Sequence, residues 1–231
     1  MSGTLTGVGV GPGDPELLTL KAVRVLAEAA VIAFPTGADG AGMARRIAAA
    51  HVPPGRVELP LPLTFDPARP ADDDYDRAAV AIAAHLDAGR DVAYLCEGDP
   101  FFYGSFIPLH RRLANRYPVR VVPGVASPMA AAAALGRPLA ERDETFAVIP
   151  ATLPAETIAA RLRATDSAVV LKLGRHLGKV AETARKLGLD ADAQCAERVG
   201  LPDERLRTLH EAEAGELPYF ALLLLRGRGG R

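Results

Sequence analysis

Short apolar runs alternate with amphipathic or alanine-rich stretches along most of the chain. This alternation predicts parallel or mixed sheets covered by helices, so we expect an α/β protein made of two α/β domains with mixed sheets. The expected strands cover 4–10, 29–34, 57–61, 91–96 and 119–122 in the first half, and 145–151, 167–173, 193–199 and 219–225 in the second. The expected helices cover 15–28, 41–51, 73–88, 103–116, 126–135, 154–164 and 176–187.

The segment RYPVRVVPG (116–124) is the expected domain boundary, because it ends a strand and then places a proline and a glycine that interrupt regular structure. We therefore predict an N-terminal α/β domain over 1–120 and a C-terminal α/β domain over 121–231. A chain of 231 residues is long enough for one large domain or two small ones, each with its own core. The segment 60–76, rich in proline and aspartate, is expected to be a surface loop leading into a helix.

The charges nearly cancel, since 27 basic and 28 acidic residues give a formal net charge of −1. No overall field draws such a protein to nucleic acid or to an anionic membrane, and we expect neither partner. Cys96 and Cys195 stand far apart, outside any metal-ligand spacing, so we expect no bound metal and a reducing, cytoplasmic location. The first residues lack a signal-peptide pattern, and the apolar run 219–225 is too short to span a bilayer.

A first glycine-rich stretch, GVGVGPGDPELLTLKAV, follows the first expected strand at 7–23. It does not match the dinucleotide-binding motif G-x-G-x-x-G, because Pro12 or Asp14 stands where the last glycine belongs. It does not match a phosphate-binding P-loop either, because no Gly-Lys-Ser/Thr follows. Two interpretations remain open: a tight turn in which Asp14 caps a helix, or a turn whose backbone a ligand can approach.

A second stretch, YLCEGDPFFYGSF at 94–106, contains five of the twelve aromatic residues of the chain, close to Glu97 and Asp99. It lies at the carboxyl end of an expected strand, where open α/β sheets bind ligands. Asp99 before Pro100 is either a helix cap or part of a negatively charged, glycine-lined site. Such a site repels phosphate and suits a cationic ligand.

A third stretch, VVPGVASPMAAAAALG at 121–136, leaves a strand through Pro123 and Gly124 and opens a helix of small residues. Small side chains leave room for a ligand, and the hydroxyl of Ser127 can donate or accept a hydrogen bond. The alternative is that Ser127 only caps the helix before Pro128.

These three motifs, in this order, resemble those of the tetrapyrrole (corrin/porphyrin) methylase family of S-adenosylmethionine-dependent methyltransferases. The resemblance continues through KLGRH (172–176), ERVGLPDE (197–204) and PYFALLLL (218–225), and so covers the length of the chain. It implies a homodimer of two α/β domains with a ligand cleft between them, and S-adenosylmethionine as the cofactor. The stretches CEGDPFFYGSF and PLTFDPARPADDDYD are the most specific, and they imply methylation of precorrin-2 at C-20 in cobalamin biosynthesis.

The resemblance also implies which residues contact the cofactor, largely through the backbone and small side chains. The matching positions here are Pro12, Glu97, Gly98, Asp99, Phe102, Ala126, Ser127, Leu173, Val199 and Ala221. An acidic, glycine-lined loop is suitable for the positively charged sulfonium of this cofactor, and a phosphate cradle is not.

A tetrapyrrole is a large, flat molecule that bears carboxylates, so we expect aromatic and cationic side chains around it. The expected substrate-binding residues are Tyr103, Ser105, Phe106, Arg111, Lys172 and Arg175. Phe102 and Phe106 also have the spacing of a helical core pair, an alternative that the sequence leaves open. A surface role is the alternative for the three cations.

Methyl transfer to an electron-rich carbon requires little acid–base chemistry, so no catalytic side chain is assigned. Holding the two reacting atoms in line is expected to supply about 7–11 kcal/mol of the barrier. Pro108, Pro128 and the loose match of ERVGLPDE depart from the family pattern and bear on substrate choice. The alternatives are cobalt-factor II or another corrin-ring carbon as the methylation target, and a nucleotide-binding α/β protein without catalytic activity.

Overall fold

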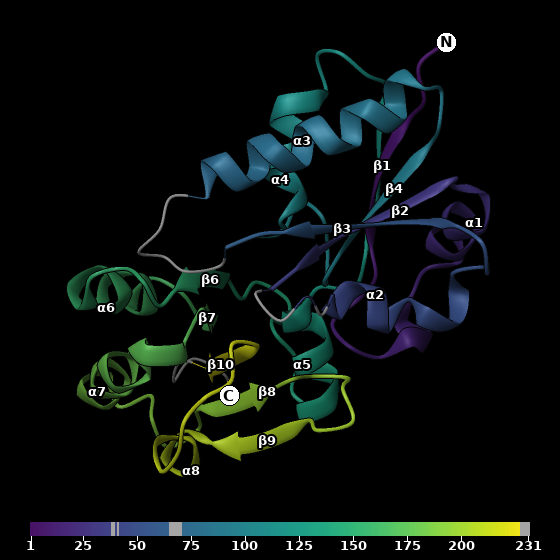
Figure 1. Ribbon diagram of the computed structural model, residues 1–231. Helices are drawn as coiled ribbons and strands as arrows, with labels where there is room; N and C mark the ends of the chain where they lie inside the picture. The colour runs from purple at the N-terminus through teal and green to yellow at the C-terminus, as the bar shows by residue number, and fades with distance from the viewer. Residues whose placement is uncertain (38–39, 41, 65–70, 227–231) are drawn as a thin grey trace. The chain divides into compact units, whose positions relative to one another are not determined.

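The chain forms two compact units, Met1–Ala126 and Ser127–Arg231, in a computed structural model that describes residues 1–37, 40, 42–64 and 71–226. Each unit contains one five-stranded sheet with helices packed on it (Figure 1), which confirms the predicted α/β class. The division predicted after residue 120 passes through β5 (Val119–Val122). Because β5 pairs with β1 (Leu5–Gly9), its hydrogen bonds place it in the first unit.

The first sheet has the strand order β3-β2-β4-β1-β5, and every neighbouring pair in it is parallel. The mixed sheet predicted for this domain is therefore wrong: each strand is followed by a crossover that returns the chain in the same direction. The remaining strands are β2 (Val31–Thr36), β3 (Val57–Pro62) and β4 (Val92–Cys96). All five carboxyl ends consequently lie at one edge of the sheet.

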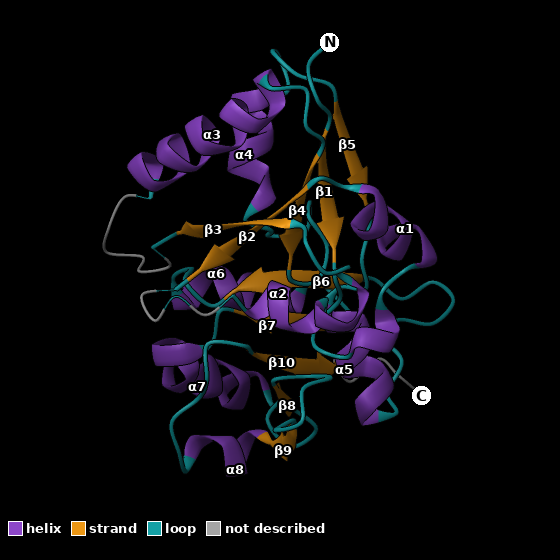
Figure 2. Cartoon of the chain, turned by 45° about the vertical axis from the view of Figure 1, so that its right-hand side comes forward, coloured by secondary structure: helices purple, strands orange, loops and turns teal. Residues whose placement is uncertain are grey.

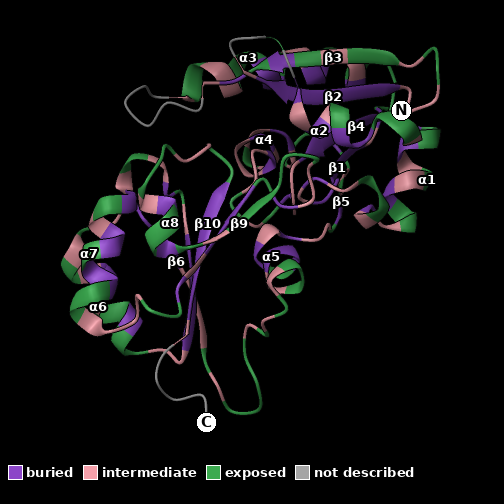
Figure 3. Cartoon of the chain, turned by 90° about the horizontal axis from the view of Figure 1, so that it is seen from below, coloured by how far each residue is buried: buried purple, intermediate pink, exposed green. Residues whose placement is uncertain are grey.

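The helices of the first unit cover both faces of its sheet, with α3 and α4 on one side and α1 and α2 on the other (Figure 1). They are α1 (Leu20–Glu28), α2 (Met43–Ile47), α3 (Asp72–Asp87) and α4 (Phe106–Leu113), with short 3₁₀ turns at Pro15–Leu17 and Ala49–His51. Strands covered on both faces are apolar throughout. Figure 3 shows β2 buried along its length, whereas the edge strand β3 is largely exposed.

The helix predicted over 15–28 is interrupted. Asp14 caps only the short 3₁₀ turn, accepting a hydrogen bond from the Glu16 amide at 2.8 Å. The backbone is extended at Leu18, and α1 then begins after Thr19, whose hydroxyl accepts from the Ala22 amide at 3.1 Å. Of the 60–76 segment, β3 runs on to Pro62 and α3 begins at Asp72, while residues 65–70 lie outside the described residues.

The second sheet has the order β6-β7-β10-β8-β9 and is mixed, as predicted. Only β6 and β7 are parallel, and the other neighbours are antiparallel. Its strands are β6 (Phe146–Pro150), β7 (Ser167–Leu171), β8 (Gln194–Glu197), β9 (Arg205–Thr208) and β10 (Ala221–Arg226). β10 is buried along most of its length (Figure 3), consistent with its central position.

β9 and the short helix α8 (Leu209–Glu213) were not predicted from the sequence. β9 is a polar, mostly exposed edge strand, so it lacks an apolar run. The available signal was a capping box, in which the Thr208 hydroxyl and the Glu211 carboxylate each bind the other's backbone amide.

The other helices of this unit are α5 (Ser127–Leu135), α6 (Ala155–Arg163) and α7 (Leu177–Leu187), with a 3₁₀ turn at Gly174–His176. α6, α7 and α8 supply apolar residues to a core built on the sheet, and α5 contacts β8. Among the described residues, no helix has the length and apolar character needed to cross a membrane.

Candidate functional site

Three loops leave the carboxyl ends of β1, β4 and β5, which lie side by side in the first sheet (Figure 2). The first two loops are joined by their backbones. The Val10 amide donates to the Cys96 carbonyl at 3.0 Å, the Gly98 amide to the Gly11 carbonyl at 2.9 Å, and the Gly11 amide to the Gly98 carbonyl at 3.3 Å. The two glycine-rich motifs recognised in the sequence thus form one pair of facing turns.

The third loop packs against the same turns without side chains between them. A Cβ added to Gly9 would lie 2.5 Å from the Gly124 amide nitrogen and 2.7 Å from the Gly98 carbonyl oxygen. A Cβ added to Gly124 would overlap that same oxygen. Gly9, Gly98 and Gly124 therefore allow the three backbones to approach each other closely, so much of this surface consists of main-chain groups.

Asp99 connects the second loop to the third. Its carboxylate accepts from the Phe101 amide at 2.9 Å and from the Gly124 amide at 3.1 Å. It does not cap a helix, since α4 begins only at Phe106, so the helix-cap interpretation is wrong. The side chain instead closes a turn over Pro100 and holds a negative charge at the meeting point of the loops.

Glu97 lies at the end of β4 and turns its side chain toward α2. Its carboxylate accepts from the Ala44 amide at 3.1 Å, in the first turn of a helix whose N-cap residue, Gly42, has no side chain to cap it. Burial raises the pKa of this carboxyl group above its usual range, although the hydrogen bond from Ala44 acts in the opposite direction. Glu97 therefore brings a poorly solvated acidic group to the candidate site.

The aromatic residues of the second loop fall into two groups. Phe106 is fully buried, with its ring centroid 5.8 Å from that of Tyr94, so the prediction that it contacts substrate is wrong. It is a core residue because α4 turns it under the sheet, where it fills the space beside Gly7. Phe101 and Tyr103 are each about half exposed, at 51% and 49%.

The predicted core pair of Phe102 and Phe106 is also replaced by other contacts. Phe101 packs against Phe106, with centroids 6.1 Å apart, and Phe102 packs edge-on against Tyr103 at 5.2 Å. Ser105, a predicted substrate contact, is half-buried, and its Oγ accepts a hydrogen bond from the Tyr94 hydroxyl at 2.9 Å.

The other predicted contacts of this region lie in or directly after the same loops. Pro12 is half-buried in the first turn, and Ala126 is buried at the end of the third loop. Ser127 is the first residue of α5, with Pro128 directly after it. Pro128, like Pro108 in α4, lies in the first helical turn, where the missing amide is not needed, so neither proline breaks its helix.

In the second unit, the structure brings Leu173, Val199 and Ala221 to one edge of the sheet. Leu173 and Val199 follow the carboxyl ends of β7 and β8, and Ala221 begins the antiparallel β10 between them. All three side chains are buried, so a ligand can reach these positions mainly through the main chain.

Strained backbone precedes two of these positions. Lys172 has φ of 61° and Arg198 has φ of 49°, both in the left-handed region that disfavours side chains other than glycine. Strain of this kind costs about 1–3 kcal/mol per residue and occurs preferentially at functional sites.

The three predicted cations are exposed and lie on separate elements. Arg111 is on α4 of the first unit, whereas Lys172 and Arg175 follow β7 in the second. Arg207 was not predicted from the sequence; its guanidinium on β9 pairs with the buried Glu197 on β8 through both Nε and Nη2. The signal was Glu197 itself, a charged residue within the strand predicted over 193–199.

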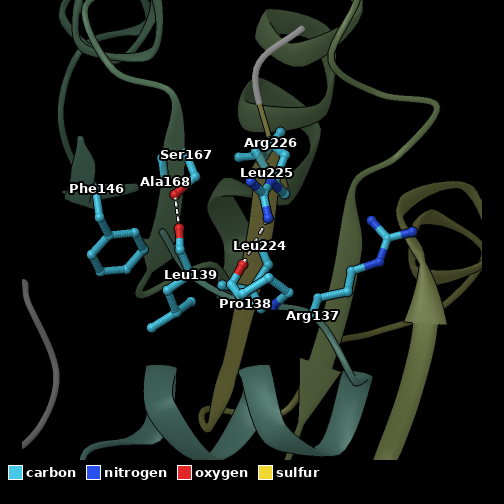
Figure 4. A pocket seen from close by; sticks show the side chains of 9 residues that line it. All are labelled: Arg137, Pro138, Leu139, Phe146, Ser167, Ala168, Leu224, Leu225 and Arg226. Carbon is cyan, nitrogen blue, oxygen red and sulfur yellow. Dashed lines mark hydrogen bonds between the residues drawn. The ribbon is translucent and has the colours of Figure 1, made fainter. Parts of the chain in front are cut away.

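A small pocket lies at the opposite edge of the second sheet, by the amino ends of β6 and β7 (Figure 4). Its polar groups bind each other: the Ser167 hydroxyl donates to the Leu139 carbonyl, and Arg226 donates to the Pro138 carbonyl and pairs with Glu144. None of the predicted ligand contacts lines it. Within the described part of the chain, no group of three or more His, Cys, Asp or Glu side chains is arranged to hold a metal ion.

Comparison with known proteins gives extended matches. The chain is 44% identical to the cobalamin biosynthesis protein CobIJ of Mycobacterium tuberculosis, over 97% of this chain and 46% of that protein. The chain thus spans about half the length of these relatives. It is 41% identical to a precorrin-2 C(20)-methyltransferase of Sinorhizobium sp, over 97% of this chain and 96% of that protein.

A crystal structure of uroporphyrin-III C-methyltransferase from Thermus thermophilus, complexed with S-adenosylhomocysteine, has a similar fold. The TM-score is 0.72 at 28% sequence identity, with 97% of each chain covered. The family model for tetrapyrrole (corrin/porphyrin) methylases matches residues 4–215. The chain therefore belongs to the tetrapyrrole (corrin/porphyrin) methylase family.

Proposed function

We propose that the protein is an S-adenosylmethionine-dependent methyltransferase that methylates C-20 of precorrin-2, giving precorrin-3A, in cobalamin biosynthesis. The observation that carries this proposal is the meeting of three glycine-containing loops at one edge of the first sheet, where Asp99 joins two of them. The 41% identity to a precorrin-2 C(20)-methyltransferase over nearly its whole length supports the choice of substrate.

The chemistry of these loops fits S-adenosylmethionine. When bound, this cofactor supplies an electrophilic methyl group on a positively charged sulfur. Glu97 and Asp99 bring two acidic groups to these loops, which favours a cation and repels the phosphates of a dinucleotide. We propose that the cofactor is held by Pro12, Glu97, Gly98, Asp99, Phe102, Ala126 and Ser127, with main-chain contacts from Leu173, Val199 and Ala221.

The contribution of the protein to the reaction is then placement. The loops orient the methyl donor and exclude water, and the half-exposed rings of Phe101 and Tyr103 provide apolar surface for a flat substrate. Ser105, Arg111, Lys172 and Arg175 complete the proposed substrate contacts, the three cations facing its carboxylates. A homodimer in the cytoplasm is proposed on the family resemblance, and light scattering of the purified protein tests the dimer.

Cofactor binding is tested by calorimetry with S-adenosylmethionine, S-adenosylhomocysteine and NAD. We expect the first two to bind and NAD not to bind. Asp99→Asn removes negative charge, so it should weaken binding of the sulfonium-bearing S-adenosylmethionine about tenfold and binding of S-adenosylhomocysteine, whose sulfur is uncharged, much less. Asp91→Asn is the matched control, because Asp91 also accepts a backbone amide, from Thr4 at 2.6 Å, but at the amino end of β4.

The substrate is tested by incubating the enzyme with precorrin-2 and isotopically labelled cofactor, and then locating the new methyl group by mass spectrometry and NMR. One labelled methyl at C-20 supports the proposal. A product formed only from cobalt-factor II, or methylated at another ring carbon, would reassign the substrate within the family. Binding of NAD alone, with no methyl transferred to any form, would favour the non-catalytic nucleotide-binding alternative.

A further inference from the structure

A tyrosine hydroxyl lies in the core directly beneath the second loop. Tyr94, in β4, is fully buried, and its hydroxyl donates to Ser105 Oγ at 2.9 Å. Burial raises the pKa of Tyr94 well above its ordinary value, so the group remains a protonated donor. A buried hydroxyl without a partner would destabilise the fold, so this hydrogen bond ties β4 to Ser105.

Ser105 also contacts a second residue of β4, Cys96. Cys96 Sγ lies 3.7 Å from Ser105 Oγ, and burial raises the pKa of this thiol to about 11. Ser105 immediately precedes α4, and the Ile107 amide donates to the Gly104 carbonyl at 3.2 Å. The carboxyl end of the loop is therefore fixed to the core and to the first turn of a helix.

The other end of the loop is fixed by Asp99, whose carbonyl accepts from the Phe102 amide at 3.2 Å. Gly104 folds back on this end, since a Cβ there would lie 2.9 Å from the Asp99 carbonyl oxygen. Between the two anchors, Tyr103 has φ of 56°. A tyrosine adopts this left-handed conformation only where the surrounding contacts impose it.

We propose that Tyr94 is a positioning residue for substrate recognition: acting through Ser105, it holds the strained Tyr103 backbone so that the Tyr103 ring is presented to the tetrapyrrole. The ring is about half exposed and packs edge-on against Phe102, with centroids 5.2 Å apart. Tyr94 itself is fully buried and touches no ligand. The role in substrate recognition rests on the proposed function, whereas the positioning of Tyr103 does not.

The first test is independent of activity. The chain has no tryptophan, so Tyr103→Trp introduces a single fluorescent reporter at the strained position. Adding Tyr94→Phe should lower the anisotropy of this reporter and increase its quenching by acrylamide. Tyr117→Phe is the matched control, because Tyr117 is also buried and its hydroxyl donates to Asp87 at 2.8 Å, away from the loop. Equal changes with both variants, or none with Tyr94→Phe, would overturn the proposal.

The second test uses methyl transfer. Tyr94→Phe should raise the KM for the tetrapyrrole about five- to tenfold, as expected for one lost hydrogen bond, and leave the Kd of S-adenosylhomocysteine within twofold. Tyr117→Phe should change neither. Ser105→Ala breaks the same hydrogen bond and should loosen the Tyr103→Trp reporter as much as Tyr94→Phe does. Because Ser105 is also a proposed substrate contact, its KM should rise at least as much, and the double variant should be no worse than Ser105→Ala alone.

The outcomes separate the two proposals. If Tyr94→Phe loosens the reporter but the wild-type protein transfers no methyl group to any tetrapyrrole, the proposed function is rejected and the positioning role is retained. Active enzyme whose cofactor affinity falls as much as its substrate affinity in Tyr94→Phe would show a general structural role and reject positioning for the substrate.

Discussion

Gly124 on the third loop lies so close to the Gly98 carbonyl oxygen on the second that no side chain fits between them. The contact joins two segments that are distant in sequence and brings a backbone amide within reach of Asp99. Glycine at this position is therefore required by the packing of two backbones, neither of which can move aside as a flexible side chain would.

Gly124→Ala is expected to separate these loops. The added methyl group should destabilise the protein by about 3 kcal/mol, as in other overpacked sites, and abolish S-adenosylmethionine binding. Gly178→Ala is the control: Gly178 lies in α7 with open space around its Cβ position, and alanine there should stabilise by up to about 1 kcal/mol. Urea unfolding measures the stability of both variants, and calorimetry measures their S-adenosylmethionine binding. Equal stability of the two variants would contradict the proposed close packing at Gly124.

Arg207 pairs with a carboxylate that is almost completely buried, since the Glu197 side chain is only 3% exposed. Arg207→Ala leaves that charge without its partner and should cost about 3 kcal/mol of unfolding free energy. Arg185→Ala breaks a more exposed pair with Glu213 and should cost less than about 1 kcal/mol. Similar losses in the two variants would mean that burial does not determine the strength of the Glu197 pair.

Glu97→Gln tests the raised pKa of Glu97. The amide oxygen of glutamine can still accept from Ala44, while the charged form, which burial disfavours, is removed. The variant should be at least as stable as wild type at pH 7. Because the folded-state pKa of Glu97 is raised, the free energy of unfolding of the wild type should increase relative to that of the variant as the pH falls toward about 4.3, the pKa of an unfolded glutamate. Denaturant unfolding at pH 7 and at pH 4.5 measures this, and a pH-independent difference would contradict it.

Both cysteines are buried, and burial raises the pKa to about 11 for Cys96 and to about 12 for Cys195. Since the thiolate is the reactive form, the native protein should react with a disulfide reagent at pH 8 only as fast as it opens, and should react fully in urea. Raised thiol pKa values also mean that stability falls as the pH rises above about 8.5, where unfolded cysteine ionises. Rapid labelling of the folded protein would contradict the first expectation, and a free energy of unfolding that does not fall as the pH rises above about 8.5 would contradict the second.

In the described part of the chain, the local pattern was sufficient to predict nine of the ten strands, because most of them contain an apolar run. β9 was missed because an exposed edge strand carries no such run. The glycine and aspartate motifs likewise identified the three loops, since turns at strand ends require these residues.

Other features depended on tertiary contacts. The purely parallel order of the first sheet follows from which strands pair, and the role of Phe106 follows from the direction in which α4 turns its side chain. The sequence Asp99–Pro100 is typical of a helix cap, but the Asp99 carboxylate accepts a hydrogen bond from the amide of Gly124, a residue 25 positions away.

The sequence by itself determined the two α/β units and the residue types at the strand ends, because these depend on periodicity and on turn chemistry between near neighbours. Only the tertiary structure decided which loops meet, which aromatic rings are exposed, that Tyr94 donates to Ser105 and that Arg207 pairs with Glu197. Such relationships depend on contacts between distant segments, and no local pattern encodes a distance in space.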